Sequence, residues 1–528
     1  MVDLYYSKDN FVSDNNLIVE GVAVEDESYD WFIPPDLSDT VRVKAIPDGF
    51  PSGYDISDDD FAIVDGGWAG TWGDTRNESF NGVVCDADGN SYATGEQLNS
   101  NTGYSLGILF KYNPAGQLVW CWIWGSETGG DYCAGKAIAI DDAGDLYITG
   151  YFQGVIDFDP GAGTDEHTSN GQRDVFVSKF DSDGTWIWTK TWGGNYDDEG
   201  KAITVRQSTF YVAGFYQDNV DFDPDPLESC IMGGYGATDI FTSIFDTSGS
   251  FITVKVEGGV DSDWANDVAV NSAGKIFVTG IFQGTVYFDE NVANMKISNG
   301  QEDVFLVWYD TDFSFQGVET WSGTGWDRGY AVDVDGLGNV YVTGSFKGLD
   351  VDFDPGDGID LISSAGQNDA FLTKFDSAVS YQWARTWGGS SGDYSFNVCV
   401  DGLCNVITVG TFYSIDMDFD PGSGSDLHAS QGWDDAYLNV LDSFGDFVMA
   451  RSWGGTDYDE AYGCAVSNTN AIFVSGLYYS SPMELAPVGA PCFEDSHQVG
   501  NNGYDDAFLS KYLPNGCLQY SEDRYEVL

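Results

Sequence analysis

The stretch Asp352-Phe353-Asp354-Pro355-Gly356 recurs along this 528-residue chain, and its surroundings recur with it. After it come the apolar segment 370–376, Trp383 and the triplet Trp387-Gly388-Gly389. Further copies begin at Asp157, Asp221 and Asp418, and Phe288-Asp289 is a degraded copy. Trp387 and Trp453 are 66 positions apart, as are Asp352 and Asp418. A fixed period of this size predicts a repeat architecture.

The unit that begins at Tyr330 shows the expected strands best. Apolar residues alternate over 330–334 and 340–344, on either side of the turn Asp335-Gly336-Leu337-Gly338-Asn339, which is typical of a hairpin. A third strand is expected from Asp369 and a fourth is expected to end at Trp387. Equivalent hairpins are predicted at 81–95, 137–150, 202–214, 266–280, 395–410 and 462–476. The sequence therefore predicts an all-β fold, a seven-bladed β-propeller of four-stranded antiparallel blades.

Residues 1–50 do not follow the repeat. They alternate over 16–24 and 41–46 and are interrupted by Pro34-Pro35, which predicts a short β-rich N-terminal extension. Residues 51–60 form a linker rich in Gly, Ser and Asp, and residues 61–528 are expected to form the propeller. A half-copy at 61–73 and a last strand near 517–520 compete for the outer edge of the final blade, and one of them is expected to close the ring.

The segments 331–344, 369–376 and 383–389 resemble the SBBP (seven-bladed β-propeller) repeat of bacterial surface and secreted proteins. The resemblance covers about residues 60–520, and the Asp-Phe-Asp-Pro-Gly stretches resemble a variant found in large exported proteins. It implies a propeller fold and an extracellular or cell-surface location, although the start of the chain lacks the features of a signal peptide. The resemblance implies no single activity.

The composition limits the partners. The chain has 85 Asp+Glu against 21 Lys+Arg, a formal net charge of -64, which repels nucleic acid and anionic membranes. An aromatic content of 15% excludes simple disorder as the explanation of this charge. There is no run of 18 apolar residues, so no membrane span is expected. Such a surface suits cations, cationic partners or a saline medium.

The Asp-Phe-Asp-Pro stretches are candidate calcium sites. In an extended segment Asp352 and Asp354 point to one side, and Asp360 follows, whereas Ca²⁺ takes six to eight oxygen ligands. In the alternative interpretation the Asp side chain caps a turn and Phe353 fills the blade. The candidate ligands are Asp157, Asp159, Asp165, Asp221, Asp223, Asp352, Asp354, Asp360, Asp418, Asp420 and Asp426.

Two further groups of acidic residues recur. The Asp that opens each third strand, such as Asp369, is expected to be a structural hydrogen-bond acceptor. The loops between units are also acidic, and together with the Asp-Phe-Asp-Pro stretches they are expected to form one intensely negative face. Their residues are Asp197, Asp198, Glu199, Asp261, Asp263, Asp327, Asp393, Asp457, Asp459 and Glu460.

No residue set in the sequence indicates catalysis. Gly388-Gly389-Ser390-Ser391-Gly392 matches a nucleophile motif, but it lacks the strand-turn-helix context that the motif needs. We therefore expect a non-enzymatic extracellular or cell-surface scaffold or binding protein with a hyperacidic, cation-binding face. The alternative is a polysaccharide-acting hydrolase or lyase on a propeller scaffold, for which a carboxylate pair and Arg328 near the central funnel would be needed.

The N-terminal extension is surplus to the predicted ring. Unpaired strand edges are normally covered, so the extension is expected to contact other copies of the chain, as in a surface array or filament. Cations and carbohydrate are further candidate partners.

Overall fold

The computed structural model describes residues 68–73, 76–99, 103–125, 131–289, 294–479 and 505–512, together with the strand segments 2–7, 16–22, 38–47, 55–56, 61–63, 483–484 and 498–499. These residues form strands and turns without an α-helix, which confirms the all-β prediction. Within this described part, no helix could cross a bilayer. The chain divides into two compact units, Met1–Trp68 with Tyr512–Leu528, and Ala69–Lys511.

The repeated part of the chain begins with two eight-stranded sheets. The first eight-stranded sheet has the order β16-β15-β12-β11-β9-β8-β7, with β10 paired to β9. Its strands are β7 (Asn77–Cys85), β8 (Ser91–Asn99), β9 (Tyr104–Tyr112), β10 (Leu118–Trp124), β11 (Tyr132–Ile140), β12 (Leu146–Gln153), β15 (Asp174–Phe180) and β16 (Trp186–Trp192). The second has the order β17-β18-β21-β22-β24-β25-β26, with β23 paired to β24. Its strands are β17 (Glu199–Arg206), β18 (Thr209–Tyr216), β21 (Asp239–Asp246), β22 (Phe251–Gly259), β23 (Trp264–Val270), β24 (Ile276–Tyr287), β25 (Met295–Tyr309) and β26 (Phe315–Trp321).

Three four-stranded sheets follow in the sequence. Their orders are β27-β28-β31-β32, β33-β34-β37-β38 and β39-β40-β43-β6. Their strands are β27 (Arg328–Val334), β28 (Val340–Phe346), β31 (Asp369–Phe375), β32 (Tyr381–Trp387), β33 (Asp393–Val400), β34 (Val406–Phe412), β37 (Asp435–Leu441), β38 (Phe447–Trp453), β39 (Asp459–Val466), β40 (Ile472–Tyr478), β43 (Asp506–Tyr512) and β6 (Trp68–Trp72). The last sheet thus takes its outer strand from the half-copy at 61–73, while 517–520 lies outside the described residues.

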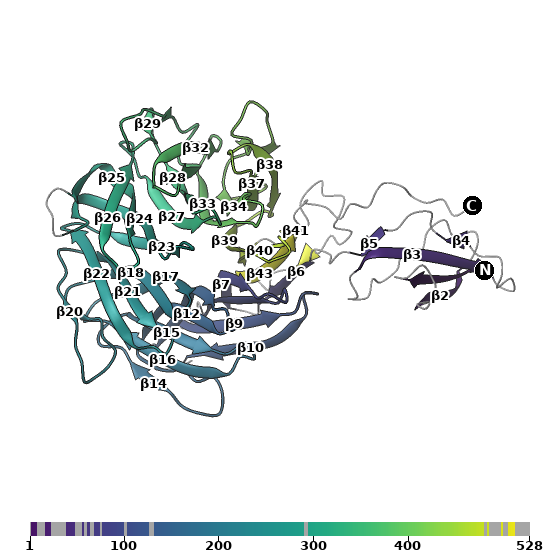
Figure 1. Cartoon of the computed structure of the whole chain (residues 1–528), viewed down its shortest axis with the longest axis horizontal. Helices are drawn as coiled ribbons and strands as arrows, with labels where there is room; N and C mark the ends of the chain where they lie inside the picture. Colours follow the sequence, from purple (N-terminus) through teal and green to yellow (C-terminus); the bar gives the residue numbers. More distant parts are fainter. Residues whose placement is uncertain are drawn as a thin grey trace. The chain divides into compact units, whose positions relative to one another are not determined.

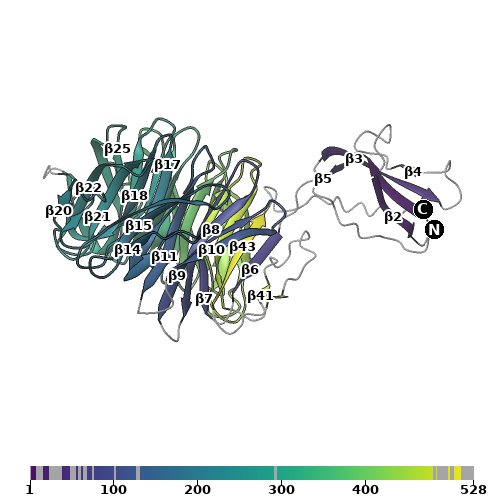
Figure 2. The ribbon, with the colours of Figure 1, turned by 90° about the horizontal axis from the view of Figure 1, so that it is seen from below.

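The sheets follow one another around a common centre, as a β-propeller requires (Figure 1). The strands nearest the centre pack in sequence order, β7 on β11, β11 on β17 and so on to β39, which packs back on β7. Figure 2 shows the same unit from the side, with the strands running between two faces. The Lys511 ammonium also donates to the Pro114 carbonyl at 3.2 Å, which ties the last sheet to the first.

Local chemistry explains why the hairpins form where the sequence predicts them. The Asp335 carboxylate accepts the backbone N–H groups of Leu337 and Asn339, both at 2.9 Å. Gly338 has φ +86°, a left-handed conformation that strains residues with a side chain. Asp at the start of the turn and Gly three residues later therefore select the turn geometry.

The connections between second and third strands carry short ladders of their own. The pairs are β13 (Val155–Asp157) with β14 (Glu166–Thr168), β19 (Val220–Asp221) with β20 (Ile231–Met232), β29 (Val351–Asp352) with β30 (Leu361–Ile362), β35 (Met417–Asp418) with β36 (Leu427–His428), and β41 (Met483–Glu484) with β42 (Gln498–Val499). Phe353, which follows β29, is fully buried, and its ring centroid lies 5.0 Å from Phe346 and 5.5 Å from Phe371. Burial of a Phe side chain stabilises a fold by about 1.5–3 kcal/mol, so this residue anchors the connection to the sheet.

The Trp that ends most fourth strands packs against the next unit. The Trp192 ring lies 5.1 Å from Phe245, and the Trp321 ring lies 5.6 Å from Phe375. Both Trp side chains are 3% exposed. The Trp residues therefore join neighbouring units through apolar contacts.

One junction between units departs from this pattern. Glu257 in β22 occupies the position of the Trp, and Tyr309 in β25 occupies the position of the Phe. The Tyr309 hydroxyl donates a hydrogen bond to Glu257 Oε1, while Glu257 Oε2 has no hydrogen-bond partner among the described residues. Burial raises the pKa of Glu257 to about 7. At this junction, a carboxyl group and the hydroxyl that donates to it thus replace the Trp and Phe rings that pack together at other junctions.

The strands near the N-terminus pair with one another. They are β1 (Val2–Ser7), β2 (Asn16–Val22), β3 (Ser38–Pro47), β4 (Asp55–Ile56) and β5 (Phe61–Ile63). Their order is β2-β1-β3-β4, and β5 also pairs with β3. Of these, β1, β2 and β3 lie within 1–50. The N-terminal extension as a separate domain, with boundaries at 50 and 60, stays a prediction.

Candidate functional site: the central cavity

The first two predicted calcium ligands of each Asp-Phe-Asp-Pro stretch hold a backbone turn. Asp352 Oδ1 accepts the N–H groups of Asp354 at 3.2 Å and Asp360 at 2.9 Å, and Asp354 Oδ1 accepts the N–H of Gly356 at 2.8 Å. The same bonds recur at Asp157, Asp159 and Asp165, and at Asp418, Asp420 and Asp426. Asp221 accepts from Asp223 and Cys230 instead. These bonds agree with the turn-cap interpretation.

The third Asp of each stretch has a different kind of partner. Asp165 Oδ2 lies 3.1 Å from His167 Nε2, Asp426 Oδ2 lies 3.3 Å from His428 Nε2, and Asp360 accepts the Tyr381 hydroxyl. Within the described ranges, no three His, Cys, Asp or Glu side chains are grouped as a metal site. Calcium binding at these stretches stays a prediction, and it can be tested directly.

We expect Ca²⁺ to raise the melting temperature more than NaCl does at matched ionic strength, because a bound divalent cation relieves repulsion between carboxylates that the fold brings together. Asp352→Asn with Asp354→Asn should remove part of that rise. Asn can still accept the turn bonds, so only the charge is lost. Asp376→Asn, at a similar turn in which Asp376 Oδ1 accepts two N–H groups at 2.9 Å, is the matched control. Equal rises with both salts would leave the turn-cap role alone.

Buried carboxylates form a second recurring group. The Asp that opens a third strand accepts the N–H four residues before it: Asp174 from Asn170 at 2.9 Å, and Asp369 from Ala365 at 2.8 Å. This confirms the structural role predicted for these residues. Burial and then the neighbouring Asp393 raise the pKa of Asp369 to about 7.

The prediction that the acidic residues of the inter-unit loops lie on a negative face is wrong for five Asp residues, one from each of five loops. Asp198, Asp263, Asp327, Asp393 and Asp459 are at most 1% exposed. They also accept loop N–H groups; Asp198 binds those of Gly194 at 2.6 Å and Gln217 at 2.9 Å. Burial raises the pKa of Asp198 to about 7 and of Asp263 to about 8. These carboxylates therefore stabilise the loop conformations from inside the protein and do not contribute to a negative surface.

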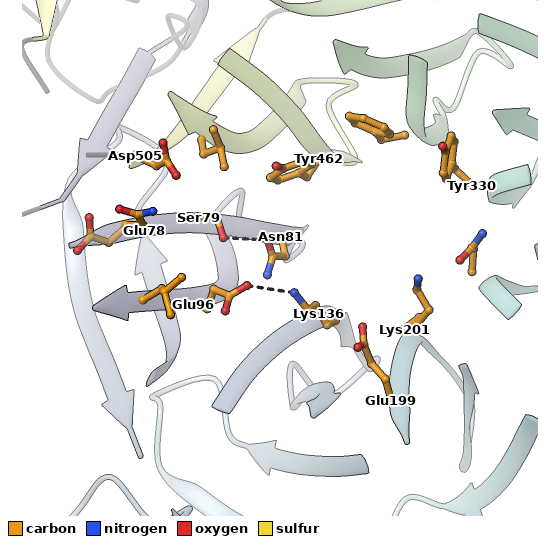
Figure 3. Close-up of a pocket in the computed structure, with 15 residues that line it drawn as sticks. Glu78, Ser79, Asn81, Glu96, Lys136, Glu199, Lys201, Tyr330, Tyr462 and Asp505 are labelled. Atoms are coloured by element: carbon orange, nitrogen blue, oxygen red, sulfur yellow. Dashed lines mark hydrogen bonds and ion pairs between the residues drawn. The ribbon is translucent and has the colours of Figure 1, made fainter. Parts of the chain in front are cut away.

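A cavity of about 410 Å³ lies at the centre of the repeated unit, at the end where first strands begin and second strands end (Figure 3). Its volume falls within the roughly 300–1,000 Å³ of known ligand pockets. It is lined by Asn77, Glu78, Ser79, Asn81, Glu96, Leu98, Lys136, Glu199, Lys201, Asn266, Tyr330, Phe396, Tyr462, Leu477 and Asp505.

Seven of the lining residues occupy one equivalent position. In each hairpin of first and second strands, one residue of the first strand is left out of the pairing, which marks a β-bulge. In the second hairpin, for example, the register shifts between Gly135 and Ala137, and Lys136 is the unpaired residue. The bulge residues are Asn81, Lys136, Lys201, Asn266, Tyr330, Phe396 and Tyr462. All seven side chains are half-buried. A bulge turns a side chain out of the pleat, so each hairpin delivers one side chain to the cavity.

One side of the cavity is aromatic. The Phe396 ring centroid lies 5.5 Å from Tyr330 and 5.8 Å from Tyr462. Tyr394 extends this group, stacked 6.1 Å from Phe396. We call Tyr330, Tyr394, Phe396 and Tyr462 the aromatic wall. The Tyr462 hydroxyl donates to Glu460, which orients its ring.

The remaining bulge residues are polar. Asn81 Nδ2 donates to the Gly135 carbonyl at 2.8 Å, and Asn266 Nδ2 donates to Gly329 at 2.7 Å, so both amides serve the backbone of a neighbouring hairpin. Lys136 Nζ lies 3.1 Å from Glu96 Oε1. Lys201 lies with its Nζ 5.1 Å from the Trp264 ring centroid and has no hydrogen bond or ion pair among the described residues. Burial lowers the pKa of Lys201.

Arg328 does not line the cavity. Its Nε donates to Glu302 Oε2 at 2.5 Å, and its guanidinium lies 5.7 Å from the Trp326 ring centroid. The arrangement expected for a hydrolase or lyase, Arg328 beside a carboxylate pair in the funnel, is therefore not found in the described lining.

The sequence analysis did not identify the bulge residues as a site. An alignment of the units would have shown one position that varies between Lys, Asn, Tyr and Phe while its neighbours repeat.

Comparison with known proteins supports a propeller repeat. The chain matches no protein-family profile. It is 23% identical over 397 residues to an uncharacterized WD repeat-containing protein of Acanthamoeba polyphaga mimivirus, a match that covers 65% of this chain and 28% of that protein. It is 25% identical over 197 residues to the regulatory protein FlaEY of Caulobacter vibrioides, covering 36% of this chain and 19% of that protein. The chain thus matches less than a third of the length of these curated relatives.

Solved structures show weaker likeness. The WD40 β-propeller domain of Doa1 has a TM-score of 0.40 at 8% identity, covering 85% of this chain and 97% of that chain. Sqt1 of Chaetomium thermophilum has a TM-score of 0.38 at 9% identity, covering 76% and 94%. Since both scores are below 0.5, the propeller description depends on the strand pairing and packing of this chain itself.

Proposed function

We propose that this protein is a non-enzymatic binding and scaffold protein of the cell surface or extracellular space, whose central cavity receives a small ligand or the end of a larger one. We further propose that its sheets are seven four-stranded blades of the SBBP-like variant with Asp-Phe-Asp-Pro-Gly stretches. In this arrangement β6 supplies the outer strand of the last blade.

The convergence of the bulge residues carries the proposal. Elsewhere in the repeat, most equivalent positions keep one residue type because they have the same structural role; Trp192, Trp321 and Trp387 are an example, to which Glu257 is the exception. The bulge position instead alternates between cationic, amide and aromatic side chains, and these are sorted into a polar side and an aromatic side. A pocket with an apolar surface and a few placed polar groups is the usual form of a ligand site.

The hydrolase or lyase alternative has less support. Three of the four carboxylates that line the cavity have side-chain partners: Glu96 is paired with Lys136, Glu78 accepts from Gln97 at 2.9 Å, and Glu199 Oε2 lies 3.8 Å from Arg173 Nη1. The fourth is Asp505, whose pKa is raised by burial. Asp434 shares its surroundings with Glu460, and burial raises the pKa of Asp434 to about 8, but this side chain is fully buried and bonded by Thr411 at 2.9 Å. A general acid must reach the substrate, and this one is enclosed.

A ligand panel tests the proposed binding. Saccharides, amino acids and nucleotides would be screened by thermal shift against the full-length protein and against Phe396→Ala, with Phe444→Ala, an exposed side chain on a distant turn, as the control. We expect at least one class to raise the melting temperature of the wild type and the control but not of Phe396→Ala. Shifts that are the same in all three proteins, or turnover of a polysaccharide substrate, would contradict the proposal.

The N-terminal strands are proposed to contact other copies of the chain, as in a surface array or filament. Among the described residues, β2 pairs with β1 alone, and a strand with a free edge can add to a second sheet. Deletion of residues 1–50 should leave a folded propeller by circular dichroism and abolish higher-order species in light scattering. A full-length protein that is monomeric at high concentration with Ca²⁺ present would rule this contact out.

A further inference from the structure

We propose that the central cavity binds a carboxylated pyranose, such as a uronate unit of an acidic glycan. This inference rests on the proposed binding function and adds the chemical class of the ligand. Three features of the cavity carry it: the aromatic wall, the Lys201 ammonium and the carboxylates of the lining.

The aromatic wall suits the apolar face of a sugar ring. Phe396 contacts both Tyr330 and Tyr462 at ring distances below 6 Å, so the three rings form a continuous surface rather than separate plugs. The rings are half-buried at the cavity, whereas the core rings of the sheets, such as Phe353, are fully buried. Sugar C–H groups can pack on such a surface while the hydroxyl groups point away from it.

Lys201 supplies a charge for a carboxylate. Lys136, one hairpin earlier, is neutralised by Glu96. Among the described residues, the Lys201 ammonium has no hydrogen bond or ion pair; it lies over the Trp264 ring, and burial lowers its pKa by more than the charge of Glu199 raises it. A half-buried ammonium without an acceptor has lost water without gaining a partner, which is unfavourable. A ligand carboxylate would restore a charge-assisted hydrogen bond at this atom.

The acidic lining residues select against other ring-bearing anions. Glu96 and Glu199 can accept hydrogen bonds from sugar hydroxyls, whereas a planar aromatic acid offers them no donor. A nucleotide would bring several negative charges close to Glu78, Glu96 and Glu199. A sugar ring with one carboxylate and several hydroxyl groups fits all three features: the ring fits the aromatic wall, the carboxylate fits Lys201, and the hydroxyl groups fit the lining carboxylates.

Calorimetry on the full-length protein tests the inference with four probes: galacturonate, glucuronate, galactose and benzoate. We expect a uronate to bind at least ten times more tightly than galactose, and benzoate not to bind. Lys201→Met should weaken uronate binding at least tenfold and weaken any binding of galactose by much less, because galactose carries no carboxylate. Lys275→Met is the matched control, because Lys275 also lies over a ring, 5.9 Å from Phe277, at the opposite end of a hairpin from the cavity.

The outcomes separate this inference from the binding function. Equal affinity for uronates and galactose, or uronate binding that survives Lys201→Met, overturns the carboxylate assignment. No saccharide binding overturns the inference entirely, while another ligand class whose effect is lost in Phe396→Ala leaves the binding function standing. Melting temperatures of the variants would verify that each is folded.

Discussion

Acidification from pH 8 to pH 5 is expected to raise the free energy of unfolding by several kcal/mol. Burial raises the pKa of Asp198 and Asp369 to about 7, and that of Asp263 to about 8. In an unfolded chain Asp titrates near pH ~3.9. The folded protein therefore binds more protons than the unfolded chain between these values, and stability increases as pH falls through this range.

Each unit of difference in pKa corresponds to about 1.4 kcal/mol, so even a few such sites outweigh a typical surface interaction. Below about pH 4 the unfolded chain is protonated too, and the gain from these groups is complete. Urea unfolding at constant ionic strength, measured between pH 5 and pH 8.5, would give the dependence. A flat curve, or stability that falls on acidification across this interval, would contradict it.

Asp263→Asn separates the local effect from general charge repulsion. Asp263 Oδ1 accepts the Gln283 N–H at 2.9 Å, and Oδ2 has no partner among the described residues. An amide in the same place keeps the bond but does not ionise. The variant should therefore be more stable than the wild type at pH 8 by about 1–3 kcal/mol and should show a shallower pH dependence. Asp312→Asn, at an exposed turn position, changes the net charge by the same amount and is the control.

The repeated fold was predictable from the sequence because its signals are local. Asp335 and Gly338 select a turn, alternation identifies strands, and Trp387 recurs at a fixed interval; none of these depends on distant contacts. The half-copy at 61–73 could be recognised but not assigned, because its choice between sheets depends on which free edge it meets. In the structure, the half-copy contributes strands to two different sheets: β5 pairs with β3, and β6 pairs with β43.

The cavity and the buried carboxylates were not predictable in the same way. Asp198 and Asp197 are adjacent and equally acidic in sequence, yet Asp198 is buried because loop N–H groups need an acceptor there. Lys201 faces the cavity because the register between β17 and β18 shifts by one residue at this point. Such a shift is set by how the two strands pair, which the local sequence does not show. Composition suggested an acidic surface, and it did not indicate that the cavity lining combines two lysines with four carboxylates.

The Glu257–Tyr309 pair is expected to show the strongest coupling between two side chains in the protein. Tyr309→Phe removes the hydroxyl that donates to Glu257 Oε1 and leaves a buried carboxylate without its partner. A buried group that loses its hydrogen-bond partner costs about 1–3 kcal/mol, and more when that group is charged. Since burial already raises the pKa of Glu257 to about 7, the variant should be far less stable at pH 8 than at pH 5.5, where the carboxyl is protonated.

The double substitution Glu257→Trp with Tyr309→Phe restores the residues found at equivalent junctions. Trp192 and Phe245 pack at 5.1 Å without any buried charge, so the double variant should recover most or all of the stability lost in either single variant. Glu257→Trp alone should remain destabilised, because the Tyr309 hydroxyl is then buried without an acceptor. Urea unfolding of the four proteins gives the coupling free energy from the double-mutant cycle, which we expect to be at least about 2 kcal/mol. Additive effects of the two substitutions would mean that the two side chains act independently. The observed contact would then not explain why both positions depart from the repeat.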